Sequence, residues 1–184
     1  MIRFSQFITE AKYHKIFEKI SDDDIEFLLY LVHDKSHVMD NTRPIPNMER
    51  VLKLTKRLAI LPRLYRGLHT KDIEVFKKHM EDEEEYFPDR YQSFSEDLKV
   101  AQKFSKGIIY TSNDNHAGFP YSHFLEWYYT NLKQTDPEEY EDQDGDGILK
   151  DNEKEWIFPM DNYYRIEKIT KKGKFWMVDG TNRN

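Results

Sequence analysis

The segment Asp142–Trp156, DQDGDGILKDNEKEW, contains carboxylates at two spacings that could do chemistry. At its end, Glu153 and Glu155 stand one residue apart and lead into the apolar residues 156–158. A fixed carboxylate can stabilise positive charge that develops in a transition state, and a second carboxylate can accept a proton from a nucleophile. The pair is therefore a candidate for acid–base and electrostatic catalysis.

The same segment has the ligand spacing of a calcium-binding loop over residues 142–153. Loops of the EF-hand type take oxygen ligands at positions 1, 3, 5, 7 and 12, with glycine at position 6 for the turn. The residues at those ligand positions are Asp142, Asp144, Asp146, Ile148 through its carbonyl oxygen, and Glu153. The flanks depart from the pattern, because Pro137 precedes the loop and a strand is expected after it. The alternative is a solvated acidic turn built from Asp-Gly pairs.

Two further segments hold polar side chains at the ends of predicted strands. Tyr65, Arg66 and Gly67 follow one another in the first, and Ser93 begins the Ser-Phe-Ser triplet of the second. A guanidinium matches the paired oxygens of a pyrophosphate better than an ammonium does. The ordinary interpretations are that Arg66 is a surface or ion-paired arginine and that Ser93 is a strand hydroxyl facing solvent.

The elements that must position these residues change in type along the chain. Ser21 and the acidic residues after it are typical of a helix start, and the apolar spacing that follows is helical. Two proline-bounded helices therefore precede a region of mixed strands and helices, which predicts an α+β fold. The expected strands are 64–68, 91–95, 107–111, 156–158, 163–169 and 174–178. In this region one helix is expected to start at Thr70, a second at Ser95, and a third is expected over 120–132. Residues 134–152 are expected to form a polar loop.

In their order and with their flanks, these motifs resemble the Arg-Ser-Glu class of mono-ADP-ribosyltransferases over residues 61–178. The resemblance implies a split β-sandwich core and NAD+ as a substrate. It implies that Glu155 stabilises the oxocarbenium-like transition state and that Ser93 holds Glu155 in place. It also implies that Arg66 binds the pyrophosphate and that the backbone at Gly67 approaches the nicotinamide.

The first glutamate of the pair indicates the acceptor in this family, and a glutamate there implies arginine. The physical reason is that a charged guanidinium, with a pKa above 12, needs a carboxylate to bind it and to remove a proton. Glu153 would hold that role, in conflict with its role as a calcium ligand. Tyr65 and Phe119 are the remaining candidates for contact with NAD+.

The first eleven residues, MIRFSQFITEA, resemble the capsid-targeting leader of internal head proteins of large contractile-tailed phages. The cleavage site would follow Glu10. The alternative is an amphipathic first helix turn that buries Ile2, Phe4, Phe7 and Ile8. The leader would place the protein in a phage head and then in the host cytoplasm, where the acceptor would be a host protein with an accessible arginine.

The composition limits the other functions. The chain has 184 residues, no cysteine and a net charge of -6, which argues against nucleic-acid and anionic-membrane surfaces and excludes thiolate chemistry. We divide it into the leader (1–10), a helical segment (11–60) and the transferase core (61–184). The alternatives are a calcium-binding interaction module and a structural head protein, both without catalysis.

Overall fold

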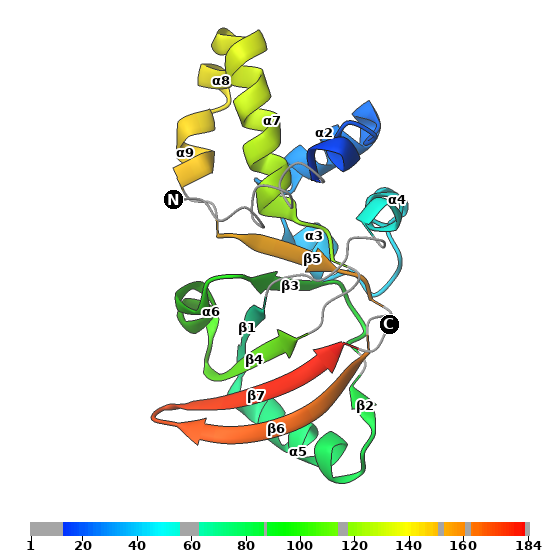
Figure 1. The fold of residues 1–184 in the computed structure, drawn as a ribbon, viewed down its shortest axis with the longest axis vertical. Helices are drawn as coiled ribbons and strands as arrows, with labels where there is room; N and C mark the ends of the chain where they lie inside the picture. The colour runs from blue at the N-terminus through cyan, green and yellow to red at the C-terminus, as the bar shows by residue number, and fades with distance from the viewer. Residues whose placement is uncertain are drawn as a thin grey trace.

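The computed structural model describes residues 13–55, 63–86, 88–113, 118–150, 153–160 and 163–182. These residues form an α+β fold in which a seven-stranded mixed sheet carries helices at its edges and ends (Figure 1). The predicted fold class is confirmed. The leader at 1–10 lies outside the described residues, as does the boundary near residue 61.

The sheet has the strand order β2-β6-β7-β4-β1-β3-β5. β1 pairs with β4 along its whole length, but with β3 only through Tyr65 and Ser95. The sheet is therefore nearly divided at this point, and β3 and β5 form a separate ladder above the other strands in Figure 1. The strands are β1 (Leu64–His69), β2 (Glu85–Tyr86), β3 (Gln92–Ser95), β4 (Gly107–Asn113), β5 (Glu155–Phe158), β6 (Tyr164–Lys172) and β7 (Phe175–Asn182).

The helices cover the two ends of this divided sheet. α5 packs beside β6 at one end, α6 packs on β1, and α7 crosses β5 at the other end, where α8 and α9 follow it (Figure 1). α2 packs against α4 on the same side as α7. The helices are α2 (Asp22–Tyr30), α3 (Ser36–Met39), α4 (Pro46–Thr55), the short 3-10 helix η1 (Thr70–Asp72), α5 (Ile73–Glu81), α6 (Leu98–Phe104), α7 (Tyr121–Thr135), α8 (Pro137–Asp142) and α9 (Gly145–Lys150).

The N-terminal helices are joined to the rest of the fold by buried contacts. The Ser21 hydroxyl caps α2 by accepting from the Asp24 backbone nitrogen at 3.3 Å, as the sequence predicts. The buried Asp24 carboxylate accepts from Arg50 of α4 at 2.6 Å. The Tyr121 hydroxyl donates to the Leu28 carbonyl oxygen at 3.0 Å, which connects α7 to α2. These bonds connect α2 to α4 and to α7, which in turn contacts β5.

β5 lies at the edge of the sheet and yet is completely buried. All four of its residues are buried, because α7 and the N-terminal helices cover the strand. Trp156 contacts Tyr13, and Phe158 contacts Phe94 of β3, both in edge-to-face geometry. Such aromatic packing stabilises a strand that has a full ladder on one side, with β3, and only the bridge between Ile157 and Phe119 on the other. The position of Glu155 at the start of this strand is consequently well defined.

The expected polar loop at 134–152 is largely helical over its described residues, where α8 and α9 follow the end of α7. The Asp136 carboxylate accepts from the Glu139 backbone nitrogen at 3.1 Å, and Pro137 occupies the first turn of α8. An acidic cap followed by proline is a strong helix start, and this local signal outweighs the polar composition. The expected cap at Ser95 is also wrong, since Asp97 caps α6 by accepting from the Lys99 nitrogen at 2.8 Å.

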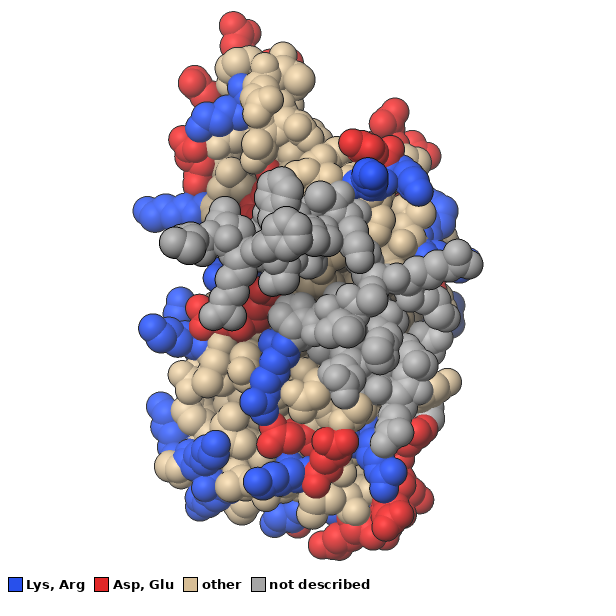
Figure 2. Space-filling model, viewed as in Figure 1, with Lys and Arg blue, Asp and Glu red and all other residues tan. Residues whose placement is uncertain are grey.

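Charged side chains are distributed unevenly over the face shown in Figure 2. Basic side chains gather toward the tip of the β6–β7 hairpin, whose sequence is rich in lysine, and acidic ones toward the end of α5 and β2. Across the part of the chain that the structure describes, no helix has the length and apolar character needed to span a membrane.

Candidate active site

A cavity of about 420 Å³ opens where β1 and β3 separate, and it collects the predicted residues. Arg66 and Gly67 come from β1, Ser93 from β3, Glu155 from the first position of β5, and Glu153 from the segment just before it. The other residues that line it are Lys35, Met39, Tyr65, Phe94, Ser95, Val100, Ala101 and Phe104. Residues separated by most of the core sequence thus meet at one site.

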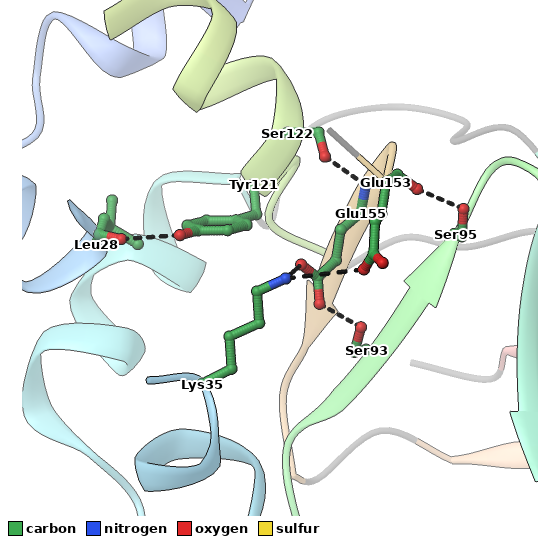
Figure 3. Close-up of polar contacts among 8 residues, drawn as sticks. All are labelled: Leu28, Lys35, Ser93, Ser95, Tyr121, Ser122, Glu153 and Glu155. Carbon is green, nitrogen blue, oxygen red and sulfur yellow. Dashed lines mark hydrogen bonds and ion pairs between the residues drawn. The ribbon is translucent and has the colours of Figure 1, made fainter. Parts of the chain in front are cut away.

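Glu155 is held from three sides (Figure 3). Its side chain is only 5% exposed, and its backbone nitrogen donates to the Ser122 hydroxyl at 2.5 Å. The Ser93 hydroxyl donates to Oε1, which is the contact expected from the sequence. The Lys35 ammonium lies 2.5 Å from Oε2. A carboxylate with both oxygens engaged has one orientation, which a catalytic group requires.

Glu153 faces the same cavity but is freer than Glu155. Its side chain is 39% exposed, and Oε2 lies 3.9 Å from the Lys35 nitrogen. Its backbone carbonyl oxygen accepts from the Ser95 hydroxyl at 2.6 Å (Figure 3). Lys154, between the two glutamates, has a φ of 51°, a left-handed conformation that is uncommon for a residue with a side chain. The kink at Lys154 brings the chain from α9 into β5.

Arg66 lies at the divided centre of the sheet. Its Nη1 donates to the Ser93 carbonyl oxygen at 3.4 Å, a long contact that leaves donors of the guanidinium for a ligand. Burial lowers the pKa of the Arg66 guanidinium, while the nearby Tyr164, Tyr86 and Glu155 act in the opposite direction. An arginine remains protonated in a protein, so this group supplies a partly desolvated positive charge.

Gly67 is required by the packing of α6 on β1. A Cβ at this position would collide with the carbonyl oxygen of Ala101 and the backbone nitrogen of Ser105. The glycine therefore lets α6 approach the strand closely, in addition to keeping the cavity wall free of a side chain. Phe104, at the end of α6, is 60% exposed and lines the cavity.

Phe119 does not line the cavity, so its assignment as an NAD+ contact is wrong. The ring is fully buried and packs against Phe17 at 6.1 Å and Phe124 at 5.9 Å between centroids. Its backbone nitrogen donates to the Ile157 carbonyl oxygen at 2.7 Å. In the sequence, a phenylalanine between glycine and proline is compatible with a core position and with a ligand contact. In the structure, the Phe119 ring packs in the core.

The described residues of 142–153 do not support the expected calcium loop. Asp142 ends α8, and residues 145–150, which include Ile148, form the helix α9. Asp146 accepts from the Tyr140 hydroxyl at 2.6 Å and from the Lys133 ammonium at 3.1 Å, and these bonds lower its pKa. Among the described residues there is no cluster of three His, Cys, Asp or Glu suited to a metal ion. The calcium assignment of Asp142, Asp144, Asp146, Ile148 and Glu153 is not supported.

Two residues of the site carry no sequence signal. Lys35, from the N-terminal helical segment, is 120 positions from its partner Glu155, and Ser122 belongs to the first turn of α7. Each is an ordinary residue in its own element, and neither stands near a recognisable motif. Only the docking of these helices against β5 brings them to Glu155.

No protein-family model matches the sequence, and no curated protein matches it. Solved structures of ADP-ribosyltransferases do resemble the fold. The Clostridium limosum C3 exoenzyme gives a TM-score of 0.60 at 12% identity, covering 96% of this chain and 93% of that chain. Exoenzyme S of Pseudomonas aeruginosa, bound to carba-NAD in a complex with human 14-3-3 protein beta, gives 0.58 at 15% identity, covering 96% and 83%. Vis of Vibrio splendidus, in complex with agmatine, gives 0.56 at 11% identity, covering 100% and 88%. The chain has the ADP-ribosyltransferase fold.

Proposed function

We propose that the protein is an NAD+-dependent mono-ADP-ribosyltransferase that modifies arginine on a host protein. The observation that carries this proposal is the meeting of Arg66, Ser93, Glu153 and Glu155 at one cavity of the ADP-ribosyltransferase fold. The cavity volume of about 420 Å³ falls within the range of small-molecule sites. The resemblance to the Arg-Ser-Glu class assigns the same residues from the sequence.

The reaction breaks the bond between the anomeric carbon of the ribose and the nicotinamide nitrogen. The bonding electron pair leaves with the nicotinamide, and the ribose acquires oxocarbenium character, as in glycoside cleavage. Glu155 supplies a fixed negative charge beside this ribose, and Ser93 holds the carboxylate in orientation. A preorganised charge of this kind acts without reorganisation at the moment of bond cleavage.

The new bond forms between the anomeric carbon and a guanidinium nitrogen of the acceptor. That nitrogen must lose one proton, and Glu153 is the carboxylate placed to bind the guanidinium and accept the proton. The products are then nicotinamide, ADP-ribosylated arginine and one proton. Vis binds agmatine, a small guanidinium compound, in a structure of the same fold, which supports a guanidinium acceptor here.

The remaining contacts would hold the two phosphates of NAD+. Arg66 presents a guanidinium on β1 and, among the described residues, makes one long hydrogen bond, to the Ser93 carbonyl oxygen. The fork geometry of the guanidinium donors suits paired phosphate oxygens. Tyr65 and Gly67 form the wall beside it, so the dinucleotide would lie along β1 toward α6.

The test is transfer of label from tagged NAD+ to agmatine and to proteins of a bacterial lysate. We expect the intact protein to transfer label and Glu155→Gln to lose about 100- to 1000-fold in kcat, the scale of removing one electrostatic stabilising group. Glu138→Gln is the matched control, because Glu138 is exposed on α8 and does not line the cavity. Equal transfer by Glu155→Gln and the intact protein would refute the assignment.

The acceptor assignment has its own variant. Glu153→Gln should abolish transfer to agmatine while retaining slow hydrolysis of NAD+, because Glu155 and Arg66 remain in place. Transfer to agmatine at the intact rate would exclude Glu153 as the acceptor-binding carboxylate. Mass spectrometry of labelled lysate proteins would then identify the modified side chain.

We propose in addition that residues 1–10 are a leader that places the protein in a phage head before delivery to the host cytoplasm. The support is the resemblance of MIRFSQFITEA to such leaders. Co-expression with a phage head maturation protease should yield a chain that begins at Ala11, measured by intact mass. An uncut chain would count against the leader.

A further inference from the structure

Lys35 occupies a position between the two glutamates that suits a cation from outside the protein. Its ammonium lies 2.5 Å from Glu155 Oε2, 3.9 Å from Glu153 Oε2 and 5.6 Å from the centroid of the Tyr121 ring (Figure 3). Two carboxylates and an aromatic face are the groups that bind a guanidinium or an ammonium. In the free protein this cation site is filled by the chain itself.

A second cavity, of about 350 Å³, adjoins the first at this position. Lys35, Glu153 and Glu155 line both cavities, so the ammonium lies at their junction. The second cavity combines acidic residues with an apolar wall, which consists of Val32, Leu125 and Ile148. An arginine has a three-carbon stem for such a wall and a charged end for the carboxylates.

We propose, on the basis of the transferase function above, that Lys35 is a stand-in for the acceptor arginine. It fills the guanidinium site when no acceptor is bound and withdraws when an arginine enters through the second cavity. Lys35 is then a specificity-determining residue, which couples activation of Glu155 to binding of the acceptor. The occupant of the second cavity is a guanidinium side chain.

The chemistry of lysine suits temporary occupation. Its side chain is 35% exposed and flexible, so the ammonium can leave toward solvent. An arginine can engage Glu153 and Glu155 through several donors at once, whereas the ammonium is bonded closely to Glu155 alone. The competition therefore favours the acceptor.

The ion pair between Lys35 and Glu155 also slows the hydrolysis of NAD+ by water. While the ammonium is bound to Oε2, the negative charge of Glu155 is compensated and stabilises an oxocarbenium ion poorly. Departure of Lys35 restores that charge at the moment when a nucleophile is present. Hydrolysis of NAD+ without acceptor should consequently be slow in the intact protein.

The experiment compares Lys35→Met with Lys35→Arg and with the control Lys53→Met, which removes a charge from the exposed surface of α4. Two quantities are measured: the dissociation constant of agmatine by calorimetry and the rate of NAD+ hydrolysis without acceptor. For Lys35→Met we expect agmatine to bind roughly 10-fold tighter and hydrolysis to rise roughly 10-fold, because a competitor that fills the site about nine-tenths of the time reduces apparent affinity by that factor. Lys35→Arg should raise the dissociation constant of agmatine and lower the rate of NAD+ hydrolysis, since its guanidinium competes better than the ammonium.

The outcomes separate this inference from the transferase assignment. If the intact protein turns over NAD+ but Lys35→Met binds agmatine no tighter, the stand-in role is refuted and the transferase assignment is retained. Weaker binding by Lys35→Met would also refute it, since Lys35 would then be part of the acceptor site. If no variant turns over NAD+, the transferase assignment fails, and the agmatine affinities still decide whether Lys35 occupies a guanidinium site. Thermal unfolding of each variant verifies that the fold is retained.

Discussion

Replacement of Ser93 by alanine tests how much of catalysis depends on the orientation of Glu155. The Ser93 hydroxyl donates to Oε1 of Glu155, and the other oxygen is engaged by Lys35. A hydrogen bond to a charged group contributes about 1.5–3 kcal/mol. If that energy holds Glu155 in its reactive orientation, kcat should fall by about 10- to 150-fold, since 1.36 kcal/mol corresponds to a factor of ten.

The assay is steady-state transfer to agmatine, with kcat and KM for NAD+ determined separately. A positioning role predicts a loss in kcat with little change in KM, because NAD+ itself would keep its contacts with Arg66. Ser93→Thr should recover most of the rate, since it retains the hydroxyl and suits a strand. A fall in kcat of less than twofold would refute the positioning role. A rise in KM with unchanged kcat would show that Ser93 contacts NAD+ and not Glu155.

Three further predictions concern packing, acid stability and the edge of the cavity. Gly67→Ala should lower the free energy of unfolding by about 1–3 kcal/mol in a urea titration, because its Cβ collides with the backbone of α6, and a neutral result would refute the close packing. The Asp24 carboxylate is buried, which raises its pKa, but bonds from Arg50, Ser21 and Asn47 outweigh this and lower it. Its stabilising contribution is therefore complete above the ordinary aspartate pKa of 3.8 and is lost as the pH falls below that value. Thermal unfolding between pH 3 and 6 should show a smaller loss of stability on acidification for Asp24→Asn than for the intact protein, and equal pH dependence would contradict the prediction. The exposed ring of Phe104 lines the cavity, where it could stack on a base of the dinucleotide, a contact worth about 1 kcal/mol. Phe104→Ala should therefore raise KM for NAD+ by roughly 3- to 10-fold without changing the stability of the protein. An unchanged KM would exclude that contact.

The short strands and their motifs could be predicted because their signals are local. Arg66, Ser93 and Glu155 each stand in or next to a short strand with an alternating or apolar pattern, and their order along the chain resembles that of the Arg-Ser-Glu class. The sequence therefore indicated the α+β fold and the motif residues that line the cavity, although not the other residues around them. It could also suggest the bond from Ser93 to Glu155, since that contact follows from the resemblance.

The errors arose where the same local pattern is compatible with two backbone conformations. The aspartates and glycines of 142–147 fit a calcium loop only if the backbone turns around a central ion. Here Asp136 caps α8, and the ring of Tyr140 packs closely on Gly145 at the start of α9, so the helical conformation is favoured. Phe119 likewise stands in a segment whose sequence does not reveal which direction the ring takes.

The sequence by itself determined the chemical groups of the site: a guanidinium, a hydroxyl and two carboxylates in short segments that reach one place. The tertiary structure decided what surrounds them. Lys35 reaches Glu155 because α2 docks on α7, where the Tyr121 hydroxyl bonds to the Leu28 carbonyl oxygen. Ser122 reaches the backbone of Glu155 because α7 crosses β5. Contacts between residues far apart in the chain depend on how whole helices and strands pack together. The spacing of residues within one helix or strand does not predict them.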